Sequence, residues 1–218
     1  DKENIKTALK NTMSMSFTPD TGLRNCTWPD DKFLHDIPWS CWVDQANTPW
    51  TGVELAFASF LIYEGLMEEA LKVVKSVESR YRRAGLYWNH QECGGHYYRA
   101  MSAWTILNAC LGLTINQDKL GFAPNIQDKE YKILFAVNGA TAHFSCNKGK
   151  YNIEVRSGRL SLQKLQLAKS MFKSSSPRVI IGRSVVNATV AHDMESIIIC
   201  FDVIQTIEAG NSIEILLH

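Results

Sequence analysis

The sequence lacks a marked excess of charge of either sign. Its 218 residues carry 23 Lys and Arg against 22 Asp and Glu, a formal net charge of +1. Proteins that bind a phosphate backbone or an anionic membrane surface usually present a strong positive excess. The near-neutral balance therefore argues against nucleic acid as a partner. The 45% of hydrophobic residues is sufficient for a folded core.

Long apolar runs and closely spaced cysteines are also missing. No run approaches the ~20 apolar residues of a membrane-spanning helix, and no charged segment followed by an apolar one opens the chain. We therefore expect no transmembrane segment. The six cysteines form no C-x-x-C pair, which disfavours a zinc module and a dense disulfide scaffold, and we expect free thiols at Cys26, Cys41, Cys93, Cys110, Cys146 and Cys200.

Several catalytic motifs are absent. There is no G-x-G-x-x-G, G-x-x-x-x-G-K-[ST], H-E-x-x-H or G-x-S-x-G, so dinucleotide, phosphate-loop, zincin and α/β-hydrolase chemistry have no support. His90-x-Glu92 is half of the zinc deaminase signature, but no P-C-x-x-C follows it. His90, Cys93 and His96 have no second ligand pair at metal spacing. We expect no metal and no other cofactor.

The composition changes near Asp118. All six tryptophans precede residue 105, and apolar residues there recur at helical spacing over 2–16, about 51–64, 68–83 and about 96–110. After Asp118, eight short β-branched segments are separated by turns such as Asn138-Gly139, Ser157-Gly158 and Gly210-Asn211. The pattern predicts a two-domain α+β protein, with an α-helical domain over 1–118 and an antiparallel β-sandwich over 119–218.

The densest group of polar and aromatic residues is 88–99, where a loop enters the last predicted helix. Glu92, His96 and Arg99 are spaced i, i+4 and i+7, which places them on one face if the helix begins early. A carboxylate beside a guanidinium can hold a vicinal diol through fixed acceptors and donors. The same spacing also fits an ion pair that only secures the loop to the helix.

A second candidate region is the long loop between residues 17 and 50, which is rich in tryptophan and aspartate. Aromatic faces beside carboxylates suit sugars, which present apolar C–H faces and a rim of hydroxyls. Large aromatics also pack helix ends, so we expect about half of these four to be core residues: Trp28, Trp39, Trp42 and Trp50.

Three sequence blocks carry a resemblance to a known family. They are P-W-T-G-V-E-L-A-F-A-S at 49–59, G-L-M-E-E-A-L at 65–71 and E-C-G-G-H-Y-Y-R-A-M at 92–101. Their order and spacing resemble the C-terminal part of glycoside hydrolase family 116, which contains β-glucosidases, β-xylosidases and non-lysosomal glucosylceramidases. The resemblance covers about residues 22–112. It implies that the helical domain is part of an (α/α)6 barrel.

The resemblance also implies a set of substrate-binding residues. Glu92 and Arg99 match a glutamate and an arginine that bind sugar hydroxyls in the first subsite, and we add His96 and Trp50 as neighbours in the matching blocks. The spacing from Glu92 to Arg99 is two residues shorter than in the glucosylceramidase branch, so the sugar is not defined. The expected partner is a β-glycoside.

The catalytic pair of the family has no counterpart in this chain. The nucleophile and the acid/base of the retaining mechanism lie upstream in the family, in segments that nothing here matches. We therefore expect a C-terminal fragment of a retaining β-glycosidase that is inactive alone; the chain also begins without Met, in a helical pattern already under way. The alternative is a non-catalytic carbohydrate-binding module, or a structural module that completes a barrel with another chain.

Overall fold

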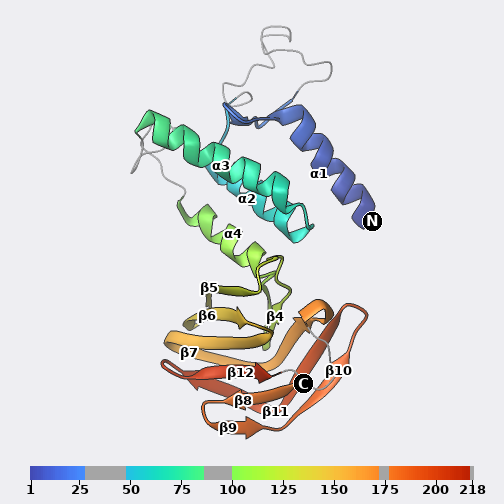
Figure 1. Cartoon of the computed structure of the whole chain (residues 1–218), viewed down its shortest axis with the longest axis vertical. Helices are drawn as coiled ribbons and strands as arrows, with labels where there is room; N and C mark the ends of the chain where they lie inside the picture. The colour runs from blue at the N-terminus through green and yellow to red at the C-terminus, as the bar shows by residue number, and fades with distance from the viewer. Residues whose placement is uncertain (28–47, 86–99, 172–176, 217–218) are drawn as a thin grey trace. The chain divides into compact units, whose positions relative to one another are not determined.

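The computed structural model describes residues 1–27, 48–85, 100–171 and 177–216, and it is an α+β protein (Figure 1). Two compact units, residues 1–106 and 107–218, make up the chain. The sequence composition changes later, near Asp118. The structural division is earlier because Leu111 and Leu113 pack in the same core as the strands that follow.

The described part of the first unit is mainly helical. Asp1 begins the first helix, since its side chain accepts a hydrogen bond of 3.0 Å from the N–H of Glu3. Gly85 ends the third, with a left-handed φ of +66°. The elements are α1 (Lys2–Ser16), β1 (Phe17–Thr18), β2 (Gly22–Leu23), α2 (Thr51–Tyr63), α3 (Met67–Ala84), the short 3₁₀ helix η5 (Ala100–Ser102) and α4 (Ala103–Cys110), whose last turn falls in the second unit.

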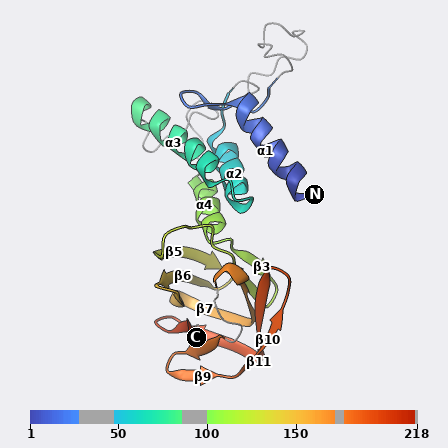
Figure 2. The same cartoon turned by 45° about the vertical axis from the view of Figure 1, so that its right-hand side comes forward.

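Helices α2 and α3 lie side by side (Figures 1 and 2). The polarity of their exposed faces differs. The buried side of α2 includes Leu55, Ala58 and Leu61, yet its exposed side is also apolar, with Val53, Phe60 and Tyr63 each more than 40% exposed. Helix α3 is different, because Ala70 and Val73 are buried while charged residues cover the opposite face. Thus α2 is apolar around its circumference and α3 is amphipathic.

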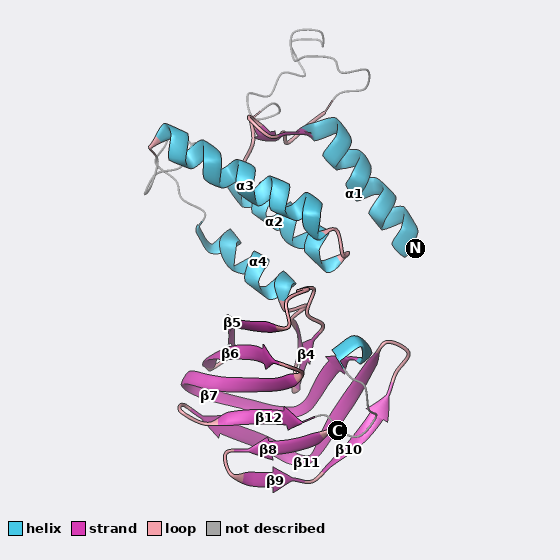
Figure 3. Cartoon of the chain, in the orientation of Figure 1, coloured by secondary structure: helices cyan, strands magenta, loops and turns pink. Residues whose placement is uncertain are grey.

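The second unit is built on strands that pair antiparallel, except for the parallel pair β4–β7 (Figure 3). The short 3₁₀ helix η6 (Lys169–Met171) follows β7 directly. The strands are β3 (Thr114–Asn116), β4 (Lys119–Phe122), β5 (Glu130–Val137), β6 (Ala140–Asn147), β7 (Lys150–Ala168), β8 (Arg178–Ile181), β9 (Ser184–Val186), β10 (Ala188–His192), β11 (Ser196–Glu208) and β12 (Ser212–Leu216).

Strand β7 joins the two halves of this sheet. Its residues 150–158 pair with β6 and its residues 159–168 pair with β11, so the orders β5–β6–β7–β12–β8–β9 and β3–β4–β7–β11–β10 share one strand. The expected turn at Ser157-Gly158 is absent, and the chain continues as a strand. Gly158 has a φ of +72°, and a Cβ there would lie 2.0 Å from the carbonyl oxygen of Gly139.

Side chains from both halves of β7 enter one core. Phe122 of β4 stacks on Phe144 of β6 with ring centroids 4.2 Å apart, and Phe135 meets Phe122 edge to face at 5.3 Å. Ile153 and Leu165, one from each half of β7, are both fully buried in this core. The core residues alternate with outward-facing ones, as the period of two requires.

Candidate functional site

The four predicted sugar-binding residues are divided between the described and undescribed parts of the chain. Glu92, His96 and Arg99 lie outside the described residues. Trp50 is described: it is half-buried, has an extended backbone and immediately precedes α2. Of the four predicted residues, the structure therefore places Trp50, at the start of α2.

The start of α2 and the end of α3 lie at one end of the helix pair. Helix α2 begins at Thr51, and α3 ends at Ala84. The start of α2 lies beside the end of α3, because Thr51 Oγ1 and Tyr81 Oη are 3.0 Å apart and hydrogen-bonded.

A buried ion pair fixes this part of the unit. Glu54 of α2 is fully buried, and its Oε2 accepts a hydrogen bond from Nη2 of Arg80 of α3, which is only 7% exposed. The other carboxylate oxygen accepts the backbone N–H of Leu23 at 2.9 Å. Arg80 Nη1 donates to Ser76 Oγ at 2.7 Å, and that hydroxyl donates to the carbonyl of Pro19 at 2.6 Å. One charge pair therefore ties α2, α3 and the β1–β2 hairpin together.

Gly22 makes room for this pair. Its φ is +94°, and a Cβ added there would lie 2.0 Å from Arg80 Nη1 and 2.4 Å from Glu54 Oε1. A side chain at this position would be strained and would displace the ion pair. Sequence reasoning did not single out Glu54 or Arg80. The sequence signal that could have identified them was Glu54 itself, a carboxylate on the buried side of an otherwise apolar helix.

A second polar cluster lies on the outer face of the β unit. Glu154 of β7 accepts hydrogen bonds from Lys132 on β5 and from Arg156, and these two cations hold the pKa of its carboxyl below the ordinary value. His143 Nδ1 is 3.9 Å from Glu154 Oε2. Burial, with Lys132 as the next cause, lowers the pKa of His143. Such cross-strand pairs brace neighbouring strands.

Neither polar cluster has the composition of a metal centre. In the ranges that the structure describes, no group of three or more His, Cys, Asp or Glu side chains could hold a metal ion. Cys26, Cys110, Cys146 and Cys200 are free thiols as predicted, while Cys41 and Cys93 lie outside the described ranges. No helix within those ranges is long and apolar enough to cross a bilayer.

Comparison of the chain with models of protein families and with curated proteins finds no match. The resemblance to glycoside hydrolase family 116 therefore depends on the three sequence blocks alone. The structure adds the position of Trp50 at the start of α2 and the buried ion pair that holds α2 against α3. Function follows from these two sources as a proposal.

Proposed function

We propose that this chain is part of a retaining β-glycosidase and supplies one wall of its sugar-binding subsite. The observation that carries the proposal is the difference between α2 and α3. In a barrel of two concentric helix rings, inner helices are covered on both faces and outer helices keep one polar face. The apolar circumference of α2 fits the inner ring, and the amphipathic α3 fits the outer ring.

In this proposal the sugar subsite lies at the end of the barrel where α2 begins and α3 ends. Glu92 accepts and Arg99 donates hydrogen bonds to neighbouring hydroxyls of one sugar ring, with His96 and Trp50 beside them. Retaining hydrolysis needs two carboxyl groups about 5 Å apart, which we assign to another part of the parent protein. The β unit would form an accessory β-sandwich after the barrel.

A second candidate function is a structural or carbohydrate-binding module that completes a barrel with another chain. The exposed apolar side of α2, with Val53, Phe60 and Tyr63, favours it, and Met101 and Trp104 are exposed as well. Further helices would cover such a surface in either case. The coding frame upstream of Asp1 separates the two functions: barrel helices in the same frame support the glycosidase, and a stop codon supports the module.

The chain by itself should not hydrolyse glycosides, because the two catalytic carboxylates are assigned elsewhere. The measurement is release of the aryl group from aryl β-glucoside and aryl β-xyloside, against a buffer blank. Turnover above the blank that disappears when a carboxylate of this chain is mutated would contradict the assignment.

In the complete enzyme, Arg99→Ala should lower kcat/KM by about 2–4 kcal/mol of transition-state stabilisation. Removing a charged donor leaves a sugar hydroxyl and the Glu92 carboxylate without their partner in the complex. The melting temperature should change little. Arg83→Ala is the matched control, since this exposed arginine pairs with Asp20 at 3.3 Å near the end of α3. A structural ion pair at Glu92 and Arg99 predicts the reverse, a lower melting temperature with nearly intact kinetics.

A further inference from the structure

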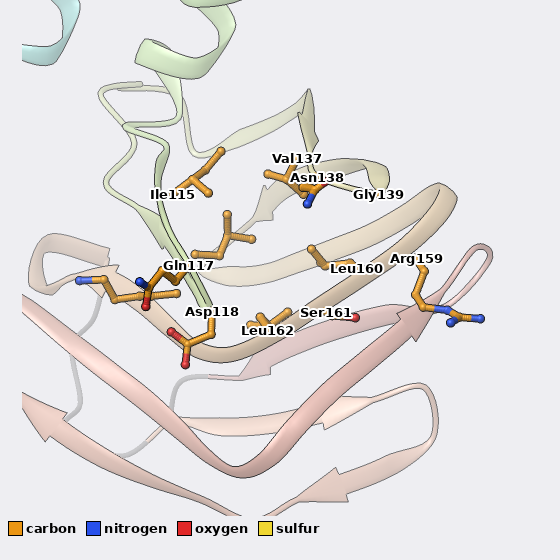
Figure 4. A pocket seen from close by; sticks show the side chains of 12 residues that line it. Ile115, Gln117, Asp118, Val137, Asn138, Gly139, Arg159, Leu160, Ser161 and Leu162 are labelled. Carbon is orange, nitrogen blue, oxygen red and sulfur yellow. The ribbon is translucent and has the colours of Figure 1, made fainter.

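The turn between β5 and β6 holds the only Asn-Gly pair of the sequence. Val137 pairs with Ala140 across this turn, so Asn138 and Gly139 form the whole connection. Both residues are exposed, and Gly139 has a φ of +83°. They lie at the rim of a hollow of about 300 Å³, which leaves open space beside the turn (Figure 4). The side-chain amide of Asn138 is therefore accessible to water and has room to change its rotamer.

Hydrogen bonds do not hold the peptide group that joins Asn138 to Gly139. Within the residues that the structure describes, the carbonyl and side chain of Asn138 and the N–H of Gly139 have no hydrogen-bond partner. The carbonyl of Gly139 is held, because it accepts the N–H of Arg159 at 2.8 Å, but it belongs to the next peptide group. The 138–139 peptide plane can therefore rotate while its neighbours stay in place. Glycine tolerates this rotation because it adopts φ of either sign.

Rotation of this plane brings the backbone nitrogen of Gly139 to the side-chain carbonyl carbon of Asn138, and no side chain at residue 139 shields the nitrogen. The nitrogen loses its proton to solvent and bonds to Asn138 Cγ. The Cγ–Nδ2 bond breaks, and Nδ2 takes a proton from water and leaves as ammonia, which closes a succinimide ring. Water then opens the ring. Attack at Cγ gives aspartate, and attack at the main-chain carbonyl carbon gives isoaspartate, in which the backbone runs through Cβ and Cγ. The reaction needs only water.

We propose that Asn138 is a site of spontaneous deamidation in the folded chain, and that its isoaspartate product weakens the β5–β6 turn. Isoaspartate lengthens the main chain of a two-residue turn by one methylene group. The turn cannot shift toward β7, because the Gly139 carbonyl oxygen lies 2.0 Å from the position that a Cβ of Gly158 would occupy, and the Arg159 N–H holds the same oxygen. The added length therefore loosens the pairing of β5 with β6 where the two strands meet the turn.

The test is incubation of the full chain at neutral pH and physiological temperature, with peptide mapping by mass spectrometry at intervals. Asn147 and Asn187 are internal controls, since both are exposed but are followed by Lys148 and Ala188. Amide loss at Asn138 should be about tenfold faster than at either control, a modest difference in activation free energy. Isoaspartate is measured in the same samples by methyl transfer from S-adenosylmethionine with an isoaspartyl methyltransferase. Equal rates at the three asparagines would overturn the proposal.

Two comparisons separate the folded turn from the bare Asn-Gly sequence. The same chain unfolded in guanidinium chloride at the same pH gives the rate without the fold, and the folded chain should react within about tenfold of it. Asn138 that stays intact in the folded chain and reacts only in the unfolded one would also overturn the proposal. Asn138→Asp creates the carboxylate without lengthening the turn, and its melting temperature should match the wild type. The isoaspartate fraction, separated by chromatography, should melt at a lower temperature; melting together with Asn138→Asp would refute the weakened turn.

Discussion

Replacing Arg80 with alanine should lower the free energy of unfolding of the helical unit by about 3–5 kcal/mol. The substitution removes the Arg80 guanidinium from the fully buried Glu54 carboxylate, and Ser76 also loses a donor. The backbone N–H of Leu23 is a neutral donor, and it offsets less of the cost of a buried charge than the guanidinium does. Denaturant unfolding followed by tryptophan fluorescence measures the change, because all six tryptophans lie in the first 104 residues.

Two further variants make the Arg80 prediction specific. Arg83→Ala removes an arginine from the same helix that is 58% exposed and paired with Asp20, and should cost at most about 1 kcal/mol. The double variant Glu54→Leu with Arg80→Met removes both charges and should recover most of the lost stability. A double variant as unstable as Arg80→Ala would show that the charges themselves are not responsible.

Phe144→Ala should destabilise the β unit by about 3–5 kcal/mol, the range for removing a fully buried phenylalanine. Phe144 has no exposed surface, and its ring lies 4.2 Å from Phe122, 6.0 Å from Tyr151 and 6.4 Å from Tyr131, measured between centroids. The cavity would lie where strands from several parts of the unit meet, so little collapse can fill it. Because this unit has no tryptophan, circular dichroism of the strands should report the loss while tryptophan fluorescence changes little.

The matched control for Phe144 is an exposed apolar residue of the same sheet. Val203 of β11 is 66% exposed, and Val203→Ala should change stability by no more than about 0.5 kcal/mol. Phe144→Leu should fall between the two, because it keeps most of the buried volume. An effect of Phe144→Ala no larger than that of Val203→Ala would mean that this stack of rings is not the centre of the core.

Local signals predicted the helices and most turns well. The start of α1 at Lys2 and the glycine at the end of α3 follow from residues next to them in the chain, and the structure has both where the sequence placed them. The turn predicted at Ser157-Gly158 was wrong: a glycine after a serine usually marks a turn, but Gly158 lies within β7. Its role depends instead on the carbonyl of Gly139, which approaches it only in the folded sheet.

For the candidate site, too, local sequence patterns do not predict contacts between residues that are far apart in the chain. Trp50 is a candidate because it belongs to a sequence block with a family resemblance, and Glu92, His96 and Arg99 are candidates because of their spacing. Glu54 and Arg80 are 26 residues apart, and no local sequence pattern around either residue predicts that the two form an ion pair. Their partnership arises from the packing of α2 against α3. It could be anticipated only as the need of a buried carboxylate for some cation.

The long strand β7 has a consequence for the order in which the β unit can form during synthesis. Its partners β5 and β6 precede it in the chain, whereas β11 and β12 follow it, the last of these ending at Leu216. When β7 leaves the ribosome, its second half has β4 on one edge and no partner on the other. An unpaired apolar edge is a template for pairing with another chain. The nascent protein is thus exposed to aggregation, or in need of a chaperone, until about fifty further residues have been added, at a synthesis rate of about 5–20 residues per second.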